Sequence, residues 1–229
     1  MAFSKIVMDE KIKEKFPDAR IGWLLADVHV QESHPYSEEL KKGLFQMLTA
    51  KDITQENLTQ QYEVAQWREV FRGMGVKPQK YRSTVEALVK RVLKDQYMWN
   101  ISSIVDMYNC VTVSTFLALG AFDTAHIEGD IILRYGQEGD KFLPLGSDEE
   151  VILVEPQHIV YADSAKIISW LWCYRDTRLT GVSLNTKEAV FIVDTAFTPR
   201  MSSVQNGLDM LSGHLIKMGC TPKDSGIVC

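Results

Sequence analysis

The residue types that usually carry acid–base or metal chemistry are scattered in this 229-residue chain. Its five histidines never recur three or four positions apart, the spacing that puts two side chains on one helix face. The four cysteines lie far apart and form no Cys-x-x-Cys pair, which is typical of buried free thiols rather than of a metal site or a disulfide framework. Glycine-rich phosphate loops and the Gly-x-Ser-x-Gly elbow of serine hydrolases do not occur either. We therefore expect no metal and no cofactor.

Acidic and amide side chains do occur where the surrounding sequence is apolar. Asp106 and Asn109 fall on a predicted helix, Asp123 lies further on, and Glu128-Gly129-Asp130 forms a predicted turn. Burying a polar group without a partner costs roughly 1 to 3 kcal/mol, so these residues need a structural or a functional reason. They either fasten the helix and cap turns or line a pocket, and the sequence alone leaves both interpretations open.

The distribution of charge carries more information than its sum. The chain holds 25 basic and 30 acidic residues, and this net charge of -5 disfavours binding of nucleic acid by bulk electrostatics. Between Trp67 and Lys94, however, eight basic residues accompany two acidic ones, so this segment alone carries 8 - 2 = +6. It is either a patch that docks a phosphate backbone or a solvated pair of helices whose charges keep the protein soluble.

Helical periodicity dominates the first half of the chain and supplies the elements that would hold these residues. Two short strands within 3–8 and 19–30 flank a charged helical turn, and a helical pattern follows His34-Pro35. The spacing then predicts helices over 54–74, from a Ser-x-x-Glu capping box at Ser83 onward, and over 101–116.

Beyond Gly129 the pattern changes to short β-like runs separated by Gly, Asp, Asn and Pro. These runs predict strands at 131–135, 151–154, 159–161, 166–174 and 189–193. Thr198-Pro199 fits the N-cap and first position of a last helix, whose apolar stripe is Val204, Leu208, Leu211 and Leu215. Helices first, strands after and a closing C-terminal helix favour an α+β fold over an alternating parallel one.

Length and hydropathy favour a single domain over residues 1–229, since no break in composition divides the chain. The longest apolar run, 167–173, is far shorter than the roughly 20 residues that span a membrane, so we expect no membrane association. The first residues lack the apolar region of a secretory signal, which favours the cytoplasm. Nothing in the sequence indicates the oligomeric state.

A series of short motifs follows in order along nearly the whole chain. They include Gly75-Val76-Lys77-Pro78, Tyr81-Arg82-Ser83-Thr84-Val85-Glu86-Ala87-Leu88, Val105-Asp106-Met107-Tyr108-Asn109, Ala121-Phe122-Asp123, Ile127-Glu128-Gly129-Asp130-Ile131 and Tyr161-Ala162-Asp163. In this order they closely resemble the editing domain of the phenylalanyl-tRNA synthetase β subunit, and they are most similar to free-standing relatives of that module. Since motifs of the other β-subunit domains are missing, we do not expect the chain to charge tRNA as a complete synthetase.

The resemblance implies an α+β domain with a curved, barrel-like mixed sheet. Within the synthetase, this module hydrolyses tyrosine wrongly attached to the phenylalanine tRNA. Such hydrolysis needs a pocket for the aminoacyl side chain and groups that hold a water near the ester carbonyl, and positioning alone can carry much of it. The expected partner is the 3′ end of a tRNA or aminoacyl-tRNA, bound weakly and transiently, with a small amino acid as the alternative ligand.

The family's editing pocket changes when it is carried over residue by residue. Its threonine-asparagine pair corresponds to Tyr108-Asn109, its histidine to Gly120, its Gly-Gly-Glu turn to the region of Tyr174-Arg175-Asp176, and its late-strand glutamate and alanine to Asp194 and Ala196. The resemblance therefore implies Asn109 and Asp194 as catalytic residues, with His126 as a substitute for the missing imidazole. The substrate-binding residues that it implies are Tyr108, Gly120, Asp123, Arg175 and Ala196.

Two function hypotheses follow from the resemblance. The first is a trans-editing deacylase that hydrolyses mischarged aminoacyl-tRNA, with Lys77, Lys80 and Arg82 on the tRNA phosphates. The second, favoured by the lost histidine, is a non-catalytic module that binds an amino acid or the aminoacyl end of tRNA. A dimeric scaffold without a ligand ranks third. The residues do not specify which amino acid or which tRNA is involved.

Overall fold

The computed structural model describes residues 3–146 and 151–229 and arranges them as seven α-helices and eleven strands. The helices are α1 (Glu10–Lys15), α2 (Pro35–Lys42), α3 (Leu44–Ala50), α4 (Tyr62–Gly73), α5 (Thr84–Asp95), α6 (Ser103–Thr115) and α7 (Val204–Lys217). The strands are β1 (Ile6–Met8), β2 (Arg20–Asp27), β3 (Ala118–Asp123), β4 (Ile131–Tyr135), β5 (Lys141–Phe142), β6 (Ile152–Leu153), β7 (Ile159–Ala162), β8 (Ile167–Trp170), β9 (Arg175–Asp176), β10 (Glu188–Thr195) and β11 (Thr221–Val228). Two 3-10 turns are η1 (Leu58–Gln60) and η2 (Thr124–His126).

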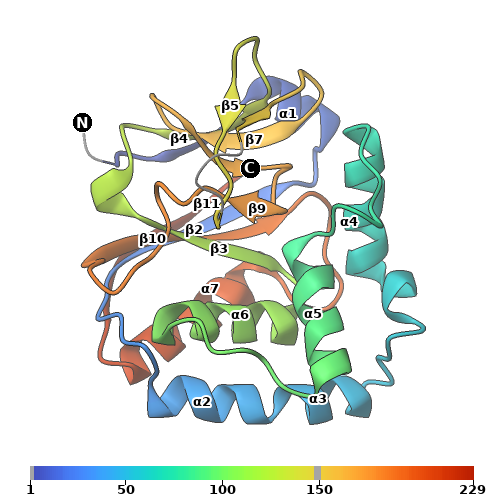
Figure 1. Ribbon diagram of the computed structural model, residues 1–229, viewed down its shortest axis with the longest axis vertical. Coiled ribbons are helices and arrows are strands. Elements are labelled where there is room, and N and C mark those ends of the chain that lie inside the picture. The colour runs from blue at the N-terminus through green and yellow to red at the C-terminus, as the bar shows by residue number, and fades with distance from the viewer. Residues whose placement is uncertain (1–2, 147–150) are drawn as a thin grey trace.

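Two main sheets form the centre of the molecule (Figure 1). The first has the order β1-β4-β7-β8-β9, with β1 parallel to β4, and the second has the antiparallel order β11-β2-β10-β3. The α+β class predicted from the sequence is confirmed. The barrel-like sheet is not, because the described strands form open sheets whose edge strands β9 and β3 do not pair with each other. β9 has only two residues, too few to continue the ladder into β3.

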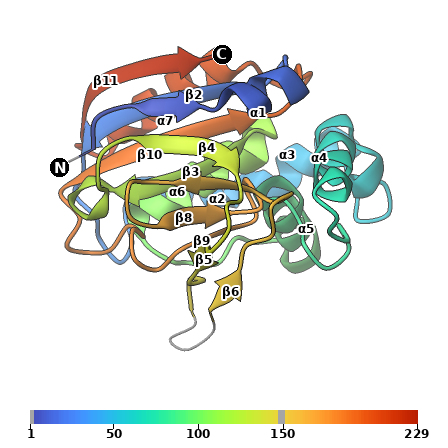
Figure 2. The same cartoon turned by 90° about the horizontal axis from the view of Figure 1, so that it is seen from above.

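The strands β3 and β10 of the second sheet are buried on both faces, and the strand alternation divides their residues between two cores. Leu119, Phe191 and Val193 pack with the apolar stripe of α7 and with α6. Phe122 and Ile192 point the other way, into the core shared with the first sheet. Figure 2 shows β11, β2 and β10 on one side of the molecule, β8 and β9 on the other, and α4 beside α5 at one end. Any site between the sheets is therefore built on two rigid surfaces.

Two helices begin later in the chain than the sequence predicts. α4 begins at Tyr62 rather than near residue 54, because η1 and the bend after it precede the regular helix. α7 begins after Ser203, whose side chain accepts a hydrogen bond from the Asn206 N–H, so the N-cap predicted at Thr198 is wrong. At α5 the predicted cap is confirmed, since Ser83 Oγ accepts from the Glu86 N–H at 3.2 Å.

Three further findings concern membrane-spanning helices, metal sites and the cysteines. In the part of the chain described, no helix is long and apolar enough to cross a membrane. Within the same residues, no three or more His, Cys, Asp or Glu side chains are grouped to hold a metal ion. The four cysteines are free, and Cys229 is exposed whereas the other three are buried.

Candidate active site

A narrow cleft lies between the two sheets, where β3 and β10 face β7 and the β8–β9 turn. Its lining includes Gly120, Tyr161, Ser169, Trp172, Asp176 and Asp194. The free space is about 20 Å³, and one water molecule needs roughly 10 to 15 Å³. In this conformation the cleft therefore has room for water and for no larger group.

Strand alternation brings Gly120 and Asp194 to the same face of the second sheet. In the β3–β10 ladder Asp194 lies opposite Ala118, and Ile192 lies opposite Gly120, so the two positions share the face that looks toward the first sheet. A Cβ built on Gly120 would lie 3.6 Å from Asp176 Oδ2. Because glycine has no side chain, the Asp176 carboxylate is left open to the cleft.

The cleft contains two carboxyl groups whose pKa values are raised toward neutrality. Burial raises the pKa of Asp194 to about 7, and the nearby Asp176 charge adds to this effect. Asp176 retains some exposure as a residue, but its carboxylate lies inside the cleft, where burial raises its pKa to about 6. The Tyr161 hydroxyl donates to Asp194 Oδ1 at 2.6 Å. A pair of carboxyl groups in this pKa range is suited to accepting and giving a proton near pH 7.

The turn between β8 and β9 forms one wall of the cleft. Leu171 and Trp172 have φ values of 53° and 62°, a left-handed conformation that costs roughly 1 to 3 kcal/mol per residue and persists only where the surroundings enforce it. Two hydrogen bonds do so: Ser169 Oγ donates to the Trp172 carbonyl at 3.0 Å, and Thr84 Oγ1 donates to the Cys173 carbonyl at 2.7 Å. The wall is thus tied to β8 and to the first turn of α5.

Trp172 presents a buried hydrogen-bond donor to the cleft. Its ring packs edge-on against Phe16 and Trp67, with centroids 5.3 and 5.4 Å apart. The indole N–H lies close enough to Asp194 and Tyr161 to lower their pKa values, yet it meets the geometry of a hydrogen bond to neither. A buried donor without a partner costs about 1 to 3 kcal/mol, so Trp172 Nε1 is ready to bind a water or a ligand oxygen.

Tyr108 and Asn109 lie on α6, and neither lines the cleft. The Tyr108 ring packs edge-on against Phe191 at 6.3 Å, on the helix-covered face of the sheet. Burial and then the Asp176 charge raise the pKa of the Tyr108 hydroxyl. Asn109 is buried, and its side chain makes no hydrogen bond with the described residues.

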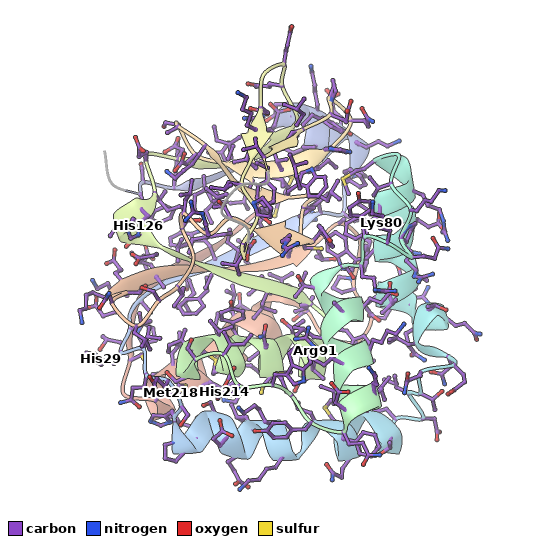
Figure 3. All side chains as sticks on the ribbon, in the orientation of Figure 1. His29, Lys80, Arg91, His126, His214 and Met218 are labelled. Carbon is purple, nitrogen blue, oxygen red and sulfur yellow. The ribbon has the colours of Figure 1, made fainter. Side chains whose placement is uncertain are left out.

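Asp123 and His126 lie apart from the cleft, beside a different surface groove. Asp123 caps η2 by accepting from the Ala125 N–H at 3.0 Å, and it accepts from Thr186 Oγ1 at 2.7 Å. His126 is 60 % exposed, with Nδ1 at 3.5 Å from Asp123 Oδ2. In Figure 3 it lies on the opposite side of the view from Lys80. His126 therefore does not supply an imidazole to the cleft, since its short turn holds it at the surface.

Ala196 and Arg175 flank the cleft without entering it. Ala196 lines a separate pocket of about 280 Å³, together with Phe16, Val70 and Phe197. Phe16 is also the ring that packs on Trp172, so the Trp172 indole stands between the two cavities. Arg175 is exposed on β9, and its Nη2 donates to the Leu145 carbonyl at 2.7 Å.

The basic segment is partly neutralised from within. Arg68 makes two hydrogen bonds of 2.9 Å to the buried Glu86, and Arg82 Nε lies 3.6 Å from the same carboxylate. Lys77 and Lys80 are exposed, and the Lys80 ammonium lies 5.1 Å from the centre of the Tyr81 ring. The segment also approaches the cleft, because Arg82 is two residues from Thr84, which lines it.

For Asp106 and the 128–130 turn the structure supports the structural interpretation. Asp106 is fully buried and accepts from Lys41 Nζ at 3.0 Å and from the Ile101 N–H at 2.9 Å. Gly129 has a φ of 78°, and a Cβ there would lie 2.7 Å from Ser164 Oγ. These polar groups fasten a helix and a tight turn, and they do not line the cleft.

Sequence reasoning missed two residues of the cleft, Tyr161 and Trp172, whereas Asp176 belongs to the segment that the resemblance placed at the pocket's Gly-Gly-Glu turn. Tyr161 was singled out only as part of a motif and Trp172 only as part of a predicted strand, so nothing linked them to Asp194, which lies 22 or more positions away. Both carry a usable signal, a polar group within an otherwise apolar strand or turn. The sequence does not show which of these groups face one another, because strand pairing alone determines it.

The comparison with known proteins agrees with the resemblance described above. The B3/4 domain family matches residues 66–225, more than half of the chain, and the chain belongs to this family. It is also similar to the phenylalanine–tRNA ligase β subunit of Chromobacterium violaceum, with 32% identity over 96 residues. That match covers 42% of this chain and only 12% of the relative, so the chain spans a small part of that protein.

The chain is also similar to one solved structure, at a lower sequence identity. An N-terminal fragment of the phenylalanyl-tRNA synthetase β subunit from Pyrococcus horikoshii aligns with 99% of this chain and 54% of its own. The TM-score is 0.48 and the sequence identity is 14%.

Proposed function

We propose that this protein is an aminoacyl-tRNA deacylase, a hydrolase that cleaves the ester between an amino acid and the 3′ end of a tRNA. One observation carries the proposal: two buried carboxyl groups with pKa values of about 6 and 7 face a water-sized space at Gly120. The family and the curated relative support the substrate class, since that relative is the β subunit of a phenylalanine–tRNA ligase. We further propose that residues 1–229 form one domain, because β2, which precedes the matched region, lies between β11 and β10 in the second sheet. A cytoplasmic location is part of the same proposal.

The proposed reaction needs one base and one acid, and the cleft offers both. Near pH 6.5 Asp176 is mostly ionised and takes a proton from the water as the water oxygen bonds to the ester carbonyl carbon. Asp194 is mostly protonated and gives its proton to the ribose oxygen as the carbon–oxygen ester bond breaks. The products are a free amino acid and a tRNA with a 3′ hydroxyl. The unpartnered Trp172 N–H stabilises the negative charge that forms on the carbonyl oxygen.

An aminoacyl group needs more room than the cleft provides. We also propose that the Trp172 side chain swings aside, which opens a connection between the cleft and the neighbouring pocket of 280 Å³. Ala196, which lines that pocket, then contacts the substrate side chain. We also propose that Tyr108, Asn109 and Arg175, which lie outside the cleft, position the substrate, and that Lys77, Lys80 and Arg82 meet the tRNA phosphates.

The test is single-turnover hydrolysis of mischarged tRNA by the intact protein and by Asp176→Asn and Asp194→Asn. Each variant should lose roughly a hundredfold in rate, the usual contribution of a positioned acid or base. Asp209→Asn, an exposed aspartate on α7, serves as the control and should keep the full rate. The wild-type rate should follow a bell-shaped pH profile with apparent pKa values of about 6 and 7. Full activity in both cleft variants would rule out this mechanism.

A second candidate function is a non-catalytic module that binds an amino acid or an aminoacyl end. The glycine at position 120, where the editing pocket of the family has a histidine, favours it. A binding module should be thermally stabilised by an amino acid or an aminoacyl-adenosine analogue without consuming an ester substrate. No shift in melting temperature across all such ligands would exclude this alternative.

A further inference from the structure

The segment that joins α5 to α6 exposes three large apolar side chains within five positions. Tyr97, Trp99 and Ile101 are 42, 57 and 57 % exposed. Figure 1 shows this segment crossing in front of α6 after α5 ends. Scattered single apolar residues are normal on a protein surface, but a cluster that includes an exposed tryptophan marks an interaction site.

The outward direction of Trp99 is built into the segment. On one side Met98 is buried at 2 % exposure. On the other side Asn100 is held twice: its Nδ2 donates to the Glu32 carbonyl at 3.0 Å, and its Oδ1 accepts from the buried Lys41 Nζ at 3.1 Å. Because both neighbours are anchored, the ring of Trp99 has no route into the core. Its exposure is a fixed property of the fold rather than a fluctuation of a loose loop.

Positive charge lies against this ring. The Arg91 guanidinium carbon lies 4.1 Å from the centre of the Trp99 ring, and Figure 3 labels Arg91 on α5. Lys90 and Lys94 are exposed on the same face of α5, and no described residue pairs with either of them. Asp95 is the acid nearest in sequence, so residues 90–95 carry a net charge of +2. The helix dipole accounts for Lys94 in the last turn of α5, since a cation is favourable there. It does not account for the exposed ring of Trp99.

We propose that Trp99, Arg91, Lys90 and Lys94 form a stacking platform for an unpaired nucleotide of the RNA whose end enters the cleft. The inference rests on the proposed function. Aromatic rings with adjacent cations are the usual means of binding single-stranded nucleic acid, because every base has a flat face and every nucleotide carries a phosphate. The positive charge favours RNA over an apolar protein surface as the occupant.

The geometry of α5 connects the platform to the cleft. Thr84, at its N-terminus, lines the cleft, and its 12 residues span about 18 Å before the chain reaches the platform. That length equals about five stacked nucleotides at roughly 3.4 Å each, and fewer if the strand is extended. An RNA with its 3′ end at the carboxyl groups would therefore place on Trp99 an unpaired nucleotide that lies up to about five positions from that end.

The test measures RNA affinity by fluorescence anisotropy with the full-length protein. The probes are an acceptor-stem minihelix with a single-stranded 3′ tail and the same duplex with a blunt end. Trp99→Ala should weaken binding of the tailed RNA about tenfold, Trp99→Phe should restore most of it, and neither should change binding of the blunt duplex. Ile216→Ala, which removes an apolar side chain 61 % exposed on α7, should have no effect. The double variant Lys90→Gln/Lys94→Gln should reduce the slope of log affinity against log salt by about 1.4.

Several outcomes would overturn the platform. One is equal affinity of wild type and Trp99→Ala for the tailed RNA, and another is equal binding of tailed and blunt RNA by wild type. A third is sedimentation showing that Trp99→Ala dissociates a dimer, which would make the patch a protein interface. A small aminoacyl ester without RNA separates the two proposals, since Trp99→Ala should hydrolyse it at the wild-type rate. If no variant hydrolyses any ester but Trp99 still governs RNA binding, the deacylase proposal fails alone.

Discussion

Asp194 and Asp176 are the residues on which the proposed chemistry depends, and their environment has a measurable effect on stability. Burial raises both pKa values above the ordinary value of an aspartate. The folded state therefore holds more protons than the unfolded state between about pH 4 and pH 7. The free energy of unfolding should fall as the pH rises through this window and level off above it.

Asp194→Asn removes the larger part of this dependence. At pH 8 the variant should be more stable than the wild type by on the order of 2 to 4 kcal/mol, because no charge remains to be buried while Tyr161 can still donate to the amide oxygen. At pH 4 the difference should shrink toward zero. Urea unfolding at both pH values measures it, with Asp209→Asn as the control. A variant that is less stable than wild type at pH 8 would show that Asp194 is not held with a raised pKa.

Gly120 separates a role in activity from a role in folding. A Cβ at this position meets Asp176 Oδ2 at 3.6 Å, an ordinary contact distance, so Gly120→Ala should change the free energy of unfolding by less than about 1 kcal/mol. The added methyl group occupies the water-sized space, and the hydrolysis rate should fall at least tenfold. Gly43→Ala, where a Cβ meets nothing within 4 Å, is the matched control. Equal rates for both variants would place the reacting water elsewhere.

At the scale of single residues, the sequence predicts part of the cleft. Gly120, Asp194 and the turn that holds Asp176 follow from the family pattern, and the structure brings all three to the cleft. Trp172 and Tyr161 could not be assigned, since their closeness to Asp194 comes from pairing between β7 and β8 and from packing of the two sheets. His126 was predicted as catalytic because it is a histidine six residues from Gly120, yet it lies at the surface, outside the cleft.

Among the secondary-structure elements, the helices were the most predictable because their apolar residues recur at helical spacing. The stripe of Leu208, Leu211 and Leu215 on α7 is buried as expected. β3 was missed because its apolar run directly follows α6, and only the left-handed Phe116 separates the two. β11 was missed because its sequence is polar, as an edge strand with a register shift between Pro222 and Asp224 permits.

The start of α7 is a testable example of a cap that sequence reasoning placed wrongly. Ser203 Oγ accepts from the Asn206 N–H at 3.1 Å, whereas Thr198 lies outside the helix. Ser203→Ala should therefore reduce the free energy of unfolding by about 1 kcal/mol, and Thr198→Ala should change it by less than about 0.5 kcal/mol. Chemical denaturation of both variants measures the difference. The reverse order would restore Thr198-Pro199 as the helix start.

For the molecule as a whole, net charge and local charge lead to different expectations for RNA. Within the basic segment, Arg68, Arg72 and Arg82 lie beside Glu86 or Glu69, which reduces the charge that a phosphate can meet. Lys77, Lys80, Lys90 and Lys94 remain exposed. Few phosphate contacts on a chain with a net charge of -5 favour weak, salt-sensitive binding of an RNA end over tight binding along a duplex.

The most direct test of the account is hydrolysis of a panel of tRNAs, each charged with a wrong amino acid, by the wild-type protein and by Asp194→Asn. We expect the wild type to release the amino acid from at least one member of the panel well above the protein-free rate, and Asp194→Asn to be about a hundredfold slower on that substrate. Release no faster than the protein-free control for every amino acid, with a folded and RNA-binding protein, would contradict the assignment of this cleft as a deacylase site.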